Sequence, residues 1–501
     1  MMNGIERKTE MGKPLCLVQA AIATRSGYGE HSRDLVRSLI KMDKFDVFVW
    51  GTRWGDTSYI NLDTDRDREI FSRMLKTPNL PKQPDIFIHV TVPNEFATQG
   101  KYNIGITAGI ETTHCSAPWI EGMNRMDLNI VPSKHAKEVF EKSIYTKLDE
   151  RTKQPVGQLK LEKPIEVLFE GADTSIFHAT DNIESTVRHE LKDIQESFCF
   201  LYVGHWLQGE MFQDRKDVGG LIKVFLETFR NVTNPPALIL KTALATNSVM
   251  DRTEIEKRIV SVRNSIPSEK PLPNVYLLHG ELTTEEMNGL YNHPKVKAHI
   301  TFTKGEGFGR PLLEASLSRK PVIAPNWSGQ TDFLNKEFSL LLPGQLTQVH
   351  PSAVWENVII PEASWFTVNY HVASNVMMQV WKDYQKFKVN ALKQTMYSEQ
   401  NFSLNKMQEI FAKILEERLP KFAEEVSLNI PLLGTMKLPK LKPMVSEPSV
   451  GNINAPLDIK SVELPYQKNE HETQIREQIN EESTNENSTD TKHGTETTSS
   501  N

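Results

Sequence analysis

The chain has 501 residues, of which 38% are hydrophobic and 24% are charged, and its formal net charge is −6. This length corresponds to two or three domains whose cores are large enough to fold without disulfides or structural metals. Cys16, Cys115 and Cys199 lie far apart without a CxxC pair, which argues against a zinc site or a disulfide framework. No run reaches the ~18 consecutive apolar residues of a membrane span, and the polar N-terminus lacks the apolar core of a signal peptide. We therefore expect a soluble, cytoplasmic protein.

The negative charge is concentrated at the C-terminal end. Residues 446–501 hold eleven Asp and Glu against four Lys and Arg, so this segment carries −7 and the first 445 residues carry +1. A nearly neutral body gives no sign of a nucleic-acid or membrane partner. The end of the chain is also poor in aromatic residues and rich in Asn, Glu, Thr and Ser, a composition that buries too little apolar surface to fold. We expect residues 430–501 to form a disordered acidic tail.

The N-terminal half alternates short apolar runs with amphipathic segments. Strands are predicted at 14–23, 45–50, 85–90, 103–107, 127–131 and 164–169. Helical spacing follows over 30–41, and Ser133 can cap a helix over 134–143. The charged segment 145–163 lacks a clear period, which favours a surface loop or insertion. This alternation predicts a doubly wound parallel sheet in a first domain, residues 12–180.

The same pattern returns after a charged helix predicted at 184–195. Strands are predicted at 197–203, 237–241, 274–278, 297–302 and 321–325, with a helix over 219–230. These elements predict a second doubly wound domain, residues 196–403. A last helix, about 405–417, lies in a C-terminal segment of residues 404–420.

The strongest motif is Gly-Glu-Gly-Phe-Gly-Arg-Pro-Leu-Leu-Glu at 305–314. Three glycines follow a predicted strand, and Pro311 suits the first turn of the next helix. Backbone amides at such a helix N-terminus favour a phosphate or diphosphate, and Arg310 would add positive charge. Glu306 cannot be there for phosphate; it suits sugar hydroxyls or a developing positive charge. Glu314, on the helix, is placed to reach a ribose.

The two glutamates at this spacing, followed by Arg-Lys-Pro-Val-Ile-Ala-Pro, resemble glycosyltransferase family 4, the retaining nucleotide-sugar transferases of the GT-B fold. The resemblance covers about residues 14–418. Weaker matches occur in the family's order at 26–29, 131–133, 170–177, 202–204 with 215–216, and 278–280 with 285–291. It implies an α/β protein with two Rossmann-like domains facing across a cleft. It further implies that the last helix returns to the N-terminal domain.

The resemblance also implies roles for individual residues. Glu306 would contact the transferred sugar and Glu314 the ribose, with the amides of Gly307, Phe308 and Gly309 against the sugar and diphosphate. Lys216, with Arg215 beside it, would neutralise the leaving diphosphate. This chain has His205 where the family usually has arginine, which leaves open which cation supplements Lys216. It also has Asp217 where glycine is usual, which points to a reshaped loop.

Four residues of the N-terminal half are candidates for the acceptor side of the cleft. Gly27 and Gly29 precede a predicted helix and leave room for an acceptor or a diphosphate. Glu111 matches an acidic residue in one branch of the family, and His114 follows it in the same loop. No Asp-x-Asp pair stands at a strand end, and a fixed Lys and Arg pair can stabilise the leaving diphosphate, so we expect no metal and no cofactor beyond the nucleotide sugar.

These observations predict a retaining hexosyltransferase that uses a nucleotide-diphosphate sugar. The resemblance implies front-face attack, so no pair of carboxylates is needed as in hydrolases. A GT-B phosphorylase, an epimerase, or a catalytically silent scaffold that binds nucleotide sugars or glycans remain alternatives. The base, the sugar and the acceptor stay open, and glycans, lipids, proteins and modified nucleic acids are all possible acceptors.

Overall fold

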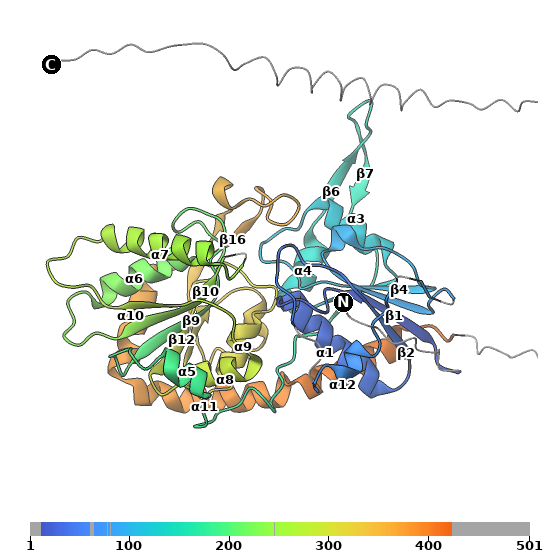
Figure 1. The fold of residues 1–501 in the computed structure, drawn as a ribbon. Coiled ribbons are helices and arrows are strands. Elements are labelled where there is room, and N and C mark those ends of the chain that lie inside the picture. Colours follow the sequence, from blue (N-terminus) through green and yellow to red (C-terminus); the bar gives the residue numbers. More distant parts are fainter. Residues whose placement is uncertain (1–11, 61–64, 78, 81, 245, 423–501) are drawn as a thin grey trace, which may run out of the picture. The chain divides into compact units, whose positions relative to one another are not determined.

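The computed structural model describes residues 12–422 except 61–64, 78, 81 and 245 (Figure 1). The predicted acidic tail, residues 430–501, lies outside the described residues. The described residues belong to one compact unit. Within the described ranges no helix combines the length and the apolar character needed to cross a membrane.

The first sheet is parallel and contains six strands in the order β2-β1-β3-β4-β5-β8. Its strands are almost wholly buried because helices and loops cover both faces, which explains their continuous apolar sequences. In chain order the elements of this half are β1 (Leu15–Ala20), α1 (Gly27–Met42), β2 (Asp46–Gly51), α2 (Arg68–Phe71), β3 (Ile86–Val90), η1 (Pro93–Glu95), β4 (Tyr102–Ile106), α3 (Ala117–Arg125), β5 (Leu128–Val131), α4 (Lys134–Lys142), β6 (Tyr145–Leu148), β7 (Pro155–Leu159) and β8 (Ile165–Val167).

The second sheet repeats this design in the order β11-β10-β9-β12-β13-β14. Its elements are α5 (Ser185–Glu190), β9 (Cys199–His205), α6 (Val218–Phe229), β10 (Ala237–Ala243), α7 (Val249–Asn264), β11 (Val275–Leu278), α8 (Thr284–Asn292), β12 (Val296–Ile300), α9 (Arg310–Ser316), β13 (Val322–Pro325), η2 (Gly329–Asp332) and β14 (Leu340–Leu342). The antiparallel pair β15 (Gly344–Gln348) and β16 (Ser364–Val368), with η3 (Pro351–Ala353) between them, is followed by α10 (Tyr370–Lys382), α11 (Tyr384–Asn401) and α12 (Leu404–Arg418).

Helix α12 packs beside α1 on the first half of the molecule (Figure 1). Met407 and Phe411 are fully buried in the same apolar cluster as strands β1 and β3. At the helix ends, Lys41 donates hydrogen bonds to Asn405 and Gln408, and Arg418 pairs with Glu166. The chain therefore ends its second half by returning to the first sheet.

Several local predictions differ from the structure. Residues 145–163 are not only a loop, because β6 and β7 form an exposed hairpin that projects from the first sheet (Figure 1). Such a hairpin has almost no buried face, so its sequence carries no apolar alternation. Helix α1 begins at Gly27 rather than at 30, because Ser26 caps it by accepting from the Gly29 amide. Helix α5 is shorter than the predicted 184–195, whereas Ser133 caps α4 as predicted. All three cysteines are buried and free.

The strand orders determine which loops meet. In each sheet, successive strands are added first on one side of the starting strand and then on the other. The order reverses between β1 and β3 in the first sheet and between β9 and β12 in the second. Loops at the carboxyl ends of strands flanking such a point form the usual ligand crevice of doubly wound sheets. The loops after β9 and β12, with the loop after β4 beside them, contain the candidates Arg215, Lys216, Gly307, Phe308, Gly309, Glu306, Glu111 and His114. Gly27 and Gly29 lie in the first turn of α1, His205 ends β9, and Arg310 and Glu314 lie on α9.

Candidate active site

The glycine loop after β12 packs against the loop after β4. A Cβ atom on Gly305 would lie 1.9 Å from the Glu111 carbonyl oxygen, and one on Gly307 would lie 1.9 Å from the Ala108 carbonyl oxygen. Gly309 adopts a φ of 99° and caps α9, where Pro311 occupies the first turn as predicted. Phe308 is buried against Phe333. Close contact between the two loops, not only ligand access, thus accounts for Gly305 and Gly307.

Four predicted residues from three loops form a charged cluster, which we call the Glu306 cluster. The Glu306 carboxylate pairs with the Lys216 ammonium through Oε1, and its Oε2 lies 3.6 Å from the Arg215 guanidinium. The same guanidinium nitrogen of Arg215 lies 3.5 Å from Glu111 and donates to the Gly305 carbonyl at 3.1 Å. All four side chains are largely removed from solvent.

The charges in this cluster stabilise one another. Burial by itself would raise the pKa of Glu306, but the charges of Lys216 and Arg215 outweigh it and hold that pKa below its ordinary value. Burial lowers the pKa of Lys216, and the neighbouring Glu306 carboxylate partly offsets this effect. Glu111 and Glu306 raise the pKa of Arg215 against the opposing effect of burial. The cluster therefore holds two fixed cations whose carboxylate partners a more anionic ligand could replace.

Two departures from the family pattern are explained by their surroundings. Asp217 adopts a φ of 49°, the left-handed conformation in which glycine is common, and its buried carboxylate accepts a hydrogen bond from Tyr370 at 2.5 Å. Lys304 lies 3.8 Å from the same carboxylate. Asp217 thus shapes the turn that leads into α6.

His205 ends β9, and its Nδ1 lies 2.8 Å from the Leu244 carbonyl oxygen. Reduced solvation lowers the pKa of His205, and the positive charges of Lys216 and Arg215 act in the same direction. A neutral imidazole cannot serve as the second cation. Among the candidates it is Arg215 that lies beside Lys216 and Glu306.

Arg310 was predicted to add positive charge to a phosphate site, but in the structure its guanidinium is surrounded by carboxylates. Its guanidinium lies 2.8 Å from Asp34 and 3.7 Å from Glu30, both on α1, and 3.1 Å from Glu314 on its own helix. Glu314 also accepts a hydrogen bond from the Tyr291 hydroxyl at 3.2 Å. Arg310 is only 8% exposed and is shared among three carboxylates, so it connects α9 to α1 instead of presenting a free charge.

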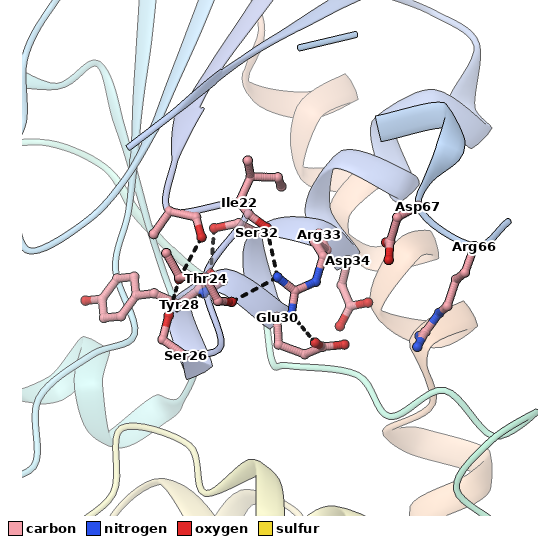
Figure 2. A network of polar contacts seen from close by, with 12 residues as sticks. Ile22, Thr24, Ser26, Tyr28, Glu30, Ser32, Arg33, Asp34, Arg66 and Asp67 are labelled. Carbon is pink, nitrogen blue, oxygen red and sulfur yellow. Dashed lines mark hydrogen bonds and ion pairs between the residues drawn. The ribbon is translucent and has the colours of Figure 1, made fainter. Parts of the chain in front are cut away.

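The loop before α1 is held by a second polar network, shown in Figure 2. Arg33 pairs with Glu30 and donates to the carbonyl oxygens of Ile22 at 2.8 Å and Thr24 at 3.1 Å. A Cβ atom on Gly29 would lie 2.2 Å from the Thr24 carbonyl oxygen, so this glycine serves the packing of the loop. At Gly27, in contrast, the corresponding space is open. Of the two predicted glycines, only Gly27 leaves room for a ligand.

A cavity of about 610 Å³ lies between this loop and the second half of the protein. Residues at the N-terminal ends of three helices line it, namely Ser26 and Gly27 of α1, Thr283 to Glu285 of α8, and Arg310 and Pro311 of α9. Glu314 faces it as well, together with Arg25, Arg33, Arg37 and Arg66. Each of these four arginines is paired with a carboxylate, so it is the helix N-termini that favour an anionic ligand here. The volume lies in the range of small-ligand pockets, ~300–1,000 Å³.

The remaining predicted residue, His114, lies apart from these groups. Its side chain is exposed, and its Nδ1 lies 3.0 Å from the Thr113 hydroxyl. It lines neither the 610 Å³ cavity nor the Glu306 cluster within the described part of the chain. In the same part of the chain, no three His, Cys, Asp or Glu side chains are grouped as metal ligands.

Sequence reasoning missed Glu170 and Tyr28. Glu170 follows β8 and is only 7% exposed, and burial raises its pKa to about 7 even though Arg310 opposes that rise. The charges of Asp34, Glu314 and Glu306 raise it further. Tyr28 binds the Thr107 hydroxyl at 2.9 Å and accepts from the Ala108 amide. Glu170 lies within a segment, 170–177, that matched the family. The sequence of this short segment does not indicate that the Glu170 side chain is buried, so its raised pKa could not be predicted.

Comparisons with known proteins identify the fold. A glycosyltransferase from Rickettsia africae superposes with a TM-score of 0.52 at 13% identity, over 82% of this chain and 100% of that structure. Sucrose-phosphate synthase from Thermosynechococcus elongatus gives 0.51 at 12% identity, over 81% and 98%. Anabaena HepE, solved in complex with UDP-glucose, gives 0.50 at 12% identity, over 81% and 100%. The fold is GT-B.

The GT-B architecture predicted from the sequence is thus confirmed, with two Rossmann-like parallel sheets. Neither a family model nor a curated protein sequence matches the chain. At 12–13% identity the similarity concerns the fold, and the chemistry has to be argued from the site.

Proposed function

We propose that this protein is a retaining glycosyltransferase of family 4 that moves a hexose from a nucleotide-diphosphate sugar to a hydroxyl acceptor. The observation that carries the proposal is the Glu306 cluster, in which a Lys and an Arg are held beside a carboxylate at the crevice of both sheets. Structures with the same fold include a glycosyltransferase and a protein bound to UDP-glucose, which supports a nucleotide sugar as donor.

In this proposal the nucleotide occupies the 610 Å³ cavity. The helix N-termini that line it favour a diphosphate, and Glu314 offers a carboxylate to the ribose hydroxyls. Gly27, with open space above its Cα, lets the ligand approach the start of α1. The amides of Gly307, Phe308 and Gly309 would complete the sugar and diphosphate site.

The donor would also rearrange the Glu306 cluster. Lys216 and Arg215 leave their carboxylate partners for the diphosphate, whose negative charge grows as the glycosidic bond breaks. This exchange frees Glu306 to accept hydrogen bonds from the sugar hydroxyls. The leaving phosphate oxygen takes the proton of the attacking hydroxyl on the same face of the sugar, so no protein nucleophile is required.

Because Lys216 and Arg215 supply the positive charge, we further propose that no metal ion or cofactor is needed. Turnover should be the same after dialysis against EDTA as after dialysis followed by added Mg²⁺ or Mn²⁺. A dependence on added metal would contradict this part of the proposal.

A donor screen and two variants test the proposal. One of the UDP-, GDP- or ADP-sugars should raise the unfolding temperature, since a ligand that binds only the folded state stabilises it. Glu306→Gln and Lys216→Ala should each lower the release of nucleoside diphosphate by about 10²–10³-fold, the effect of removing one charge-stabilising group. The exposed Lys257 supplies the control variant, Lys257→Ala, with unchanged release. Near-normal turnover in both folded cluster variants would refute the site assignment.

The same assay separates the alternatives raised by the sequence. Release that requires inorganic phosphate would identify a phosphorylase, and conversion of the donor sugar without release would identify an epimerase. A silent scaffold would bind the donor and leave it intact. The positions of Asp217 and Arg215 favour an active enzyme, because Asp217 shapes a turn and Arg215 supplies the second cation.

A further inference from the structure

Residues 349–363, which connect β15 to β16, contact both halves of the protein. On the side of the second sheet, Gln208 donates to the Val354 carbonyl at 2.9 Å, and the Glu210 amide donates to Ser352 at 3.1 Å. On the side of the first sheet, Ser116 donates to the Asn357 carbonyl at 2.9 Å. The connection therefore lies across the crevice next to the Glu306 cluster.

A second cavity, of about 340 Å³, lies beneath this connection. Two members of the Glu306 cluster, Glu111 and Arg215, line it, so the cavity is continuous with the proposed reaction centre. Its other walls are mainly apolar and include two indole rings, those of Trp206 and Trp355. It is separate from the 610 Å³ cavity, with which it shares no lining residue.

Trp355 is held in place although its side chain is half exposed. Its amide and carbonyl both pair with Ile359, at 3.0 and 2.8 Å, around a turn in which Asn357 is left-handed. The residue is 54% exposed, which is unusual because tryptophan side chains are on average largely buried. A fixed backbone and an exposed ring give a ready surface for stacking.

The charged groups of this cavity are already compensated. Arg215 is paired with Glu111 and Glu306, and Arg258 is paired with Glu254 while it covers the ring of Trp206. Among the described lining residues no further Asp, Glu, Lys or Arg occurs. Outside the Glu306 cluster, the one charged group among the described lining residues is the paired Arg258, so the cavity suits a neutral ligand whose hydroxyl groups can bind Glu111 and Gln208.

We propose that this cavity is the acceptor subsite and that it takes a sugar ring of a neutral glycan. A pyranose has an apolar face of C–H groups that packs on an indole ring and an equatorial rim of hydroxyls that suits carboxylate, guanidinium and amide groups. The assignment of this cavity as an acceptor subsite rests on the function proposed above. The inference that a neutral glycan binds beside Trp355 is independent of that function.

Binding measurements on the full-length protein test this inference. Titration calorimetry with maltotriose, cellotriose and chitotriose should detect binding of at least one trisaccharide. Trp355→Ala should weaken that binding about tenfold, and Trp355→Phe, which keeps an aromatic face, by about twofold. Leu346→Ala, at another exposed apolar residue of the same hairpin, should bind like the wild type. Vesicles of anionic phospholipid and a single-stranded oligonucleotide serve as competing ligands.

The outcomes separate this inference from the proposed function. If no trisaccharide binds, if Trp355→Ala binds like the wild type, or if only vesicles or the oligonucleotide bind, the inference is wrong. In the transfer assay, Trp355→Ala should raise the KM for the glycan. Glycan binding that depends on Trp355, without any turnover of donor, would uphold the glycan site and refute the transferase.

Discussion

At the scale of single residues, two buried carboxyl groups have unusual acidity. The pKa values of Glu170 and Glu314 are both raised to about 7, chiefly by burial, with Arg310 opposing the rise in each case. Both groups are therefore partly protonated near neutral pH. A folded-state pKa above the ordinary value of 4.5 means that the folded protein binds more protons than the unfolded chain between pH 4.5 and 7. Their contribution to stability is present below pH 4.5 and is lost as the pH rises through 7.

This linkage predicts the behaviour of Glu170→Gln. The amide resembles the protonated carboxyl, so the variant should match the wild type in stability at pH 4. At pH 8 it should be more stable, by up to about 3 kcal/mol, because the wild type must ionise a buried group there. Urea unfolding at the two pH values checks this. The exposed Glu162 provides the control, Glu162→Gln, which should show no such difference. An equal effect at both pH values would show that ionisation of Glu170 is not involved.

The glycines of the crevice give a second prediction at this scale. In Gly307→Ala the new methyl group would overlap the Ala108 carbonyl, so the loop after β12 must move away from the loop after β4. We expect a loss of about 1–3 kcal/mol in the free energy of unfolding and lower turnover. In Gly27→Ala the methyl group meets open space at a helix start, and stability should be preserved. Chemical denaturation compares the two, and equal stability would mean that the loops separate freely.

At the scale of elements, α12 follows the second half in the sequence but stabilises the first half. Its apolar face, Met407, Phe411, Ile414 and Leu415, is buried in the core of the first half. After α12, Leu419 and Phe422 still pack against this core, and the described residues end there. The sequence could predict a helix here from its periodicity, whereas its partner α1 lies more than 360 residues away along the chain.

Two truncations test this division. A chain that ends at residue 425 keeps α12 and should retain its fold and its turnover of donor. A chain that ends at residue 403 exposes the apolar surface of α1 and should unfold or aggregate, since each large buried side chain lost costs about 2–5 kcal/mol. Circular dichroism and donor turnover measure both. Loss of turnover in a folded 1–425 chain would show that the acidic segment takes part in catalysis.

At the scale of the whole molecule, Arg310 joins a helix of the second half to a helix of the first. Arg310 on α9 pairs with Asp34 on α1, and both side chains are nearly inaccessible to solvent. Its removal would take from the buried Asp34 the nearer of its two cations and leave Arg37, at 3.0 Å, as the other, which is more costly than the loss of a surface pair. The sequence placed Arg310 at a helix start, where it looked available for phosphate. Only the packing of α9 against α1 gives it three carboxylate partners.

A double-mutant cycle measures this connection. Asp34→Ala and Arg310→Ala should each cost about 3–5 kcal/mol, and the double variant should cost less than their sum by about 2 kcal/mol or more. The more exposed pair of Arg418 and Glu166 provides a reference cycle with a coupling below about 1 kcal/mol. Additive effects at Asp34 and Arg310 would mean that the ion pair does not hold the two helices together.

The sequence by itself determined most strands of the two sheets, because apolar periods are local properties, and through the resemblance of its 305–314 motif it implied the GT-B architecture and the candidate residues Glu306, Lys216 and Arg215. Only the tertiary structure decided that Arg215, not His205, lies beside Lys216, that Arg310 pairs with α1, and that Trp355 borders a cavity beside Glu111. It also revealed the acidity of Glu170. Burial and charge partners depend on segments far apart in the chain, and no local pattern records them.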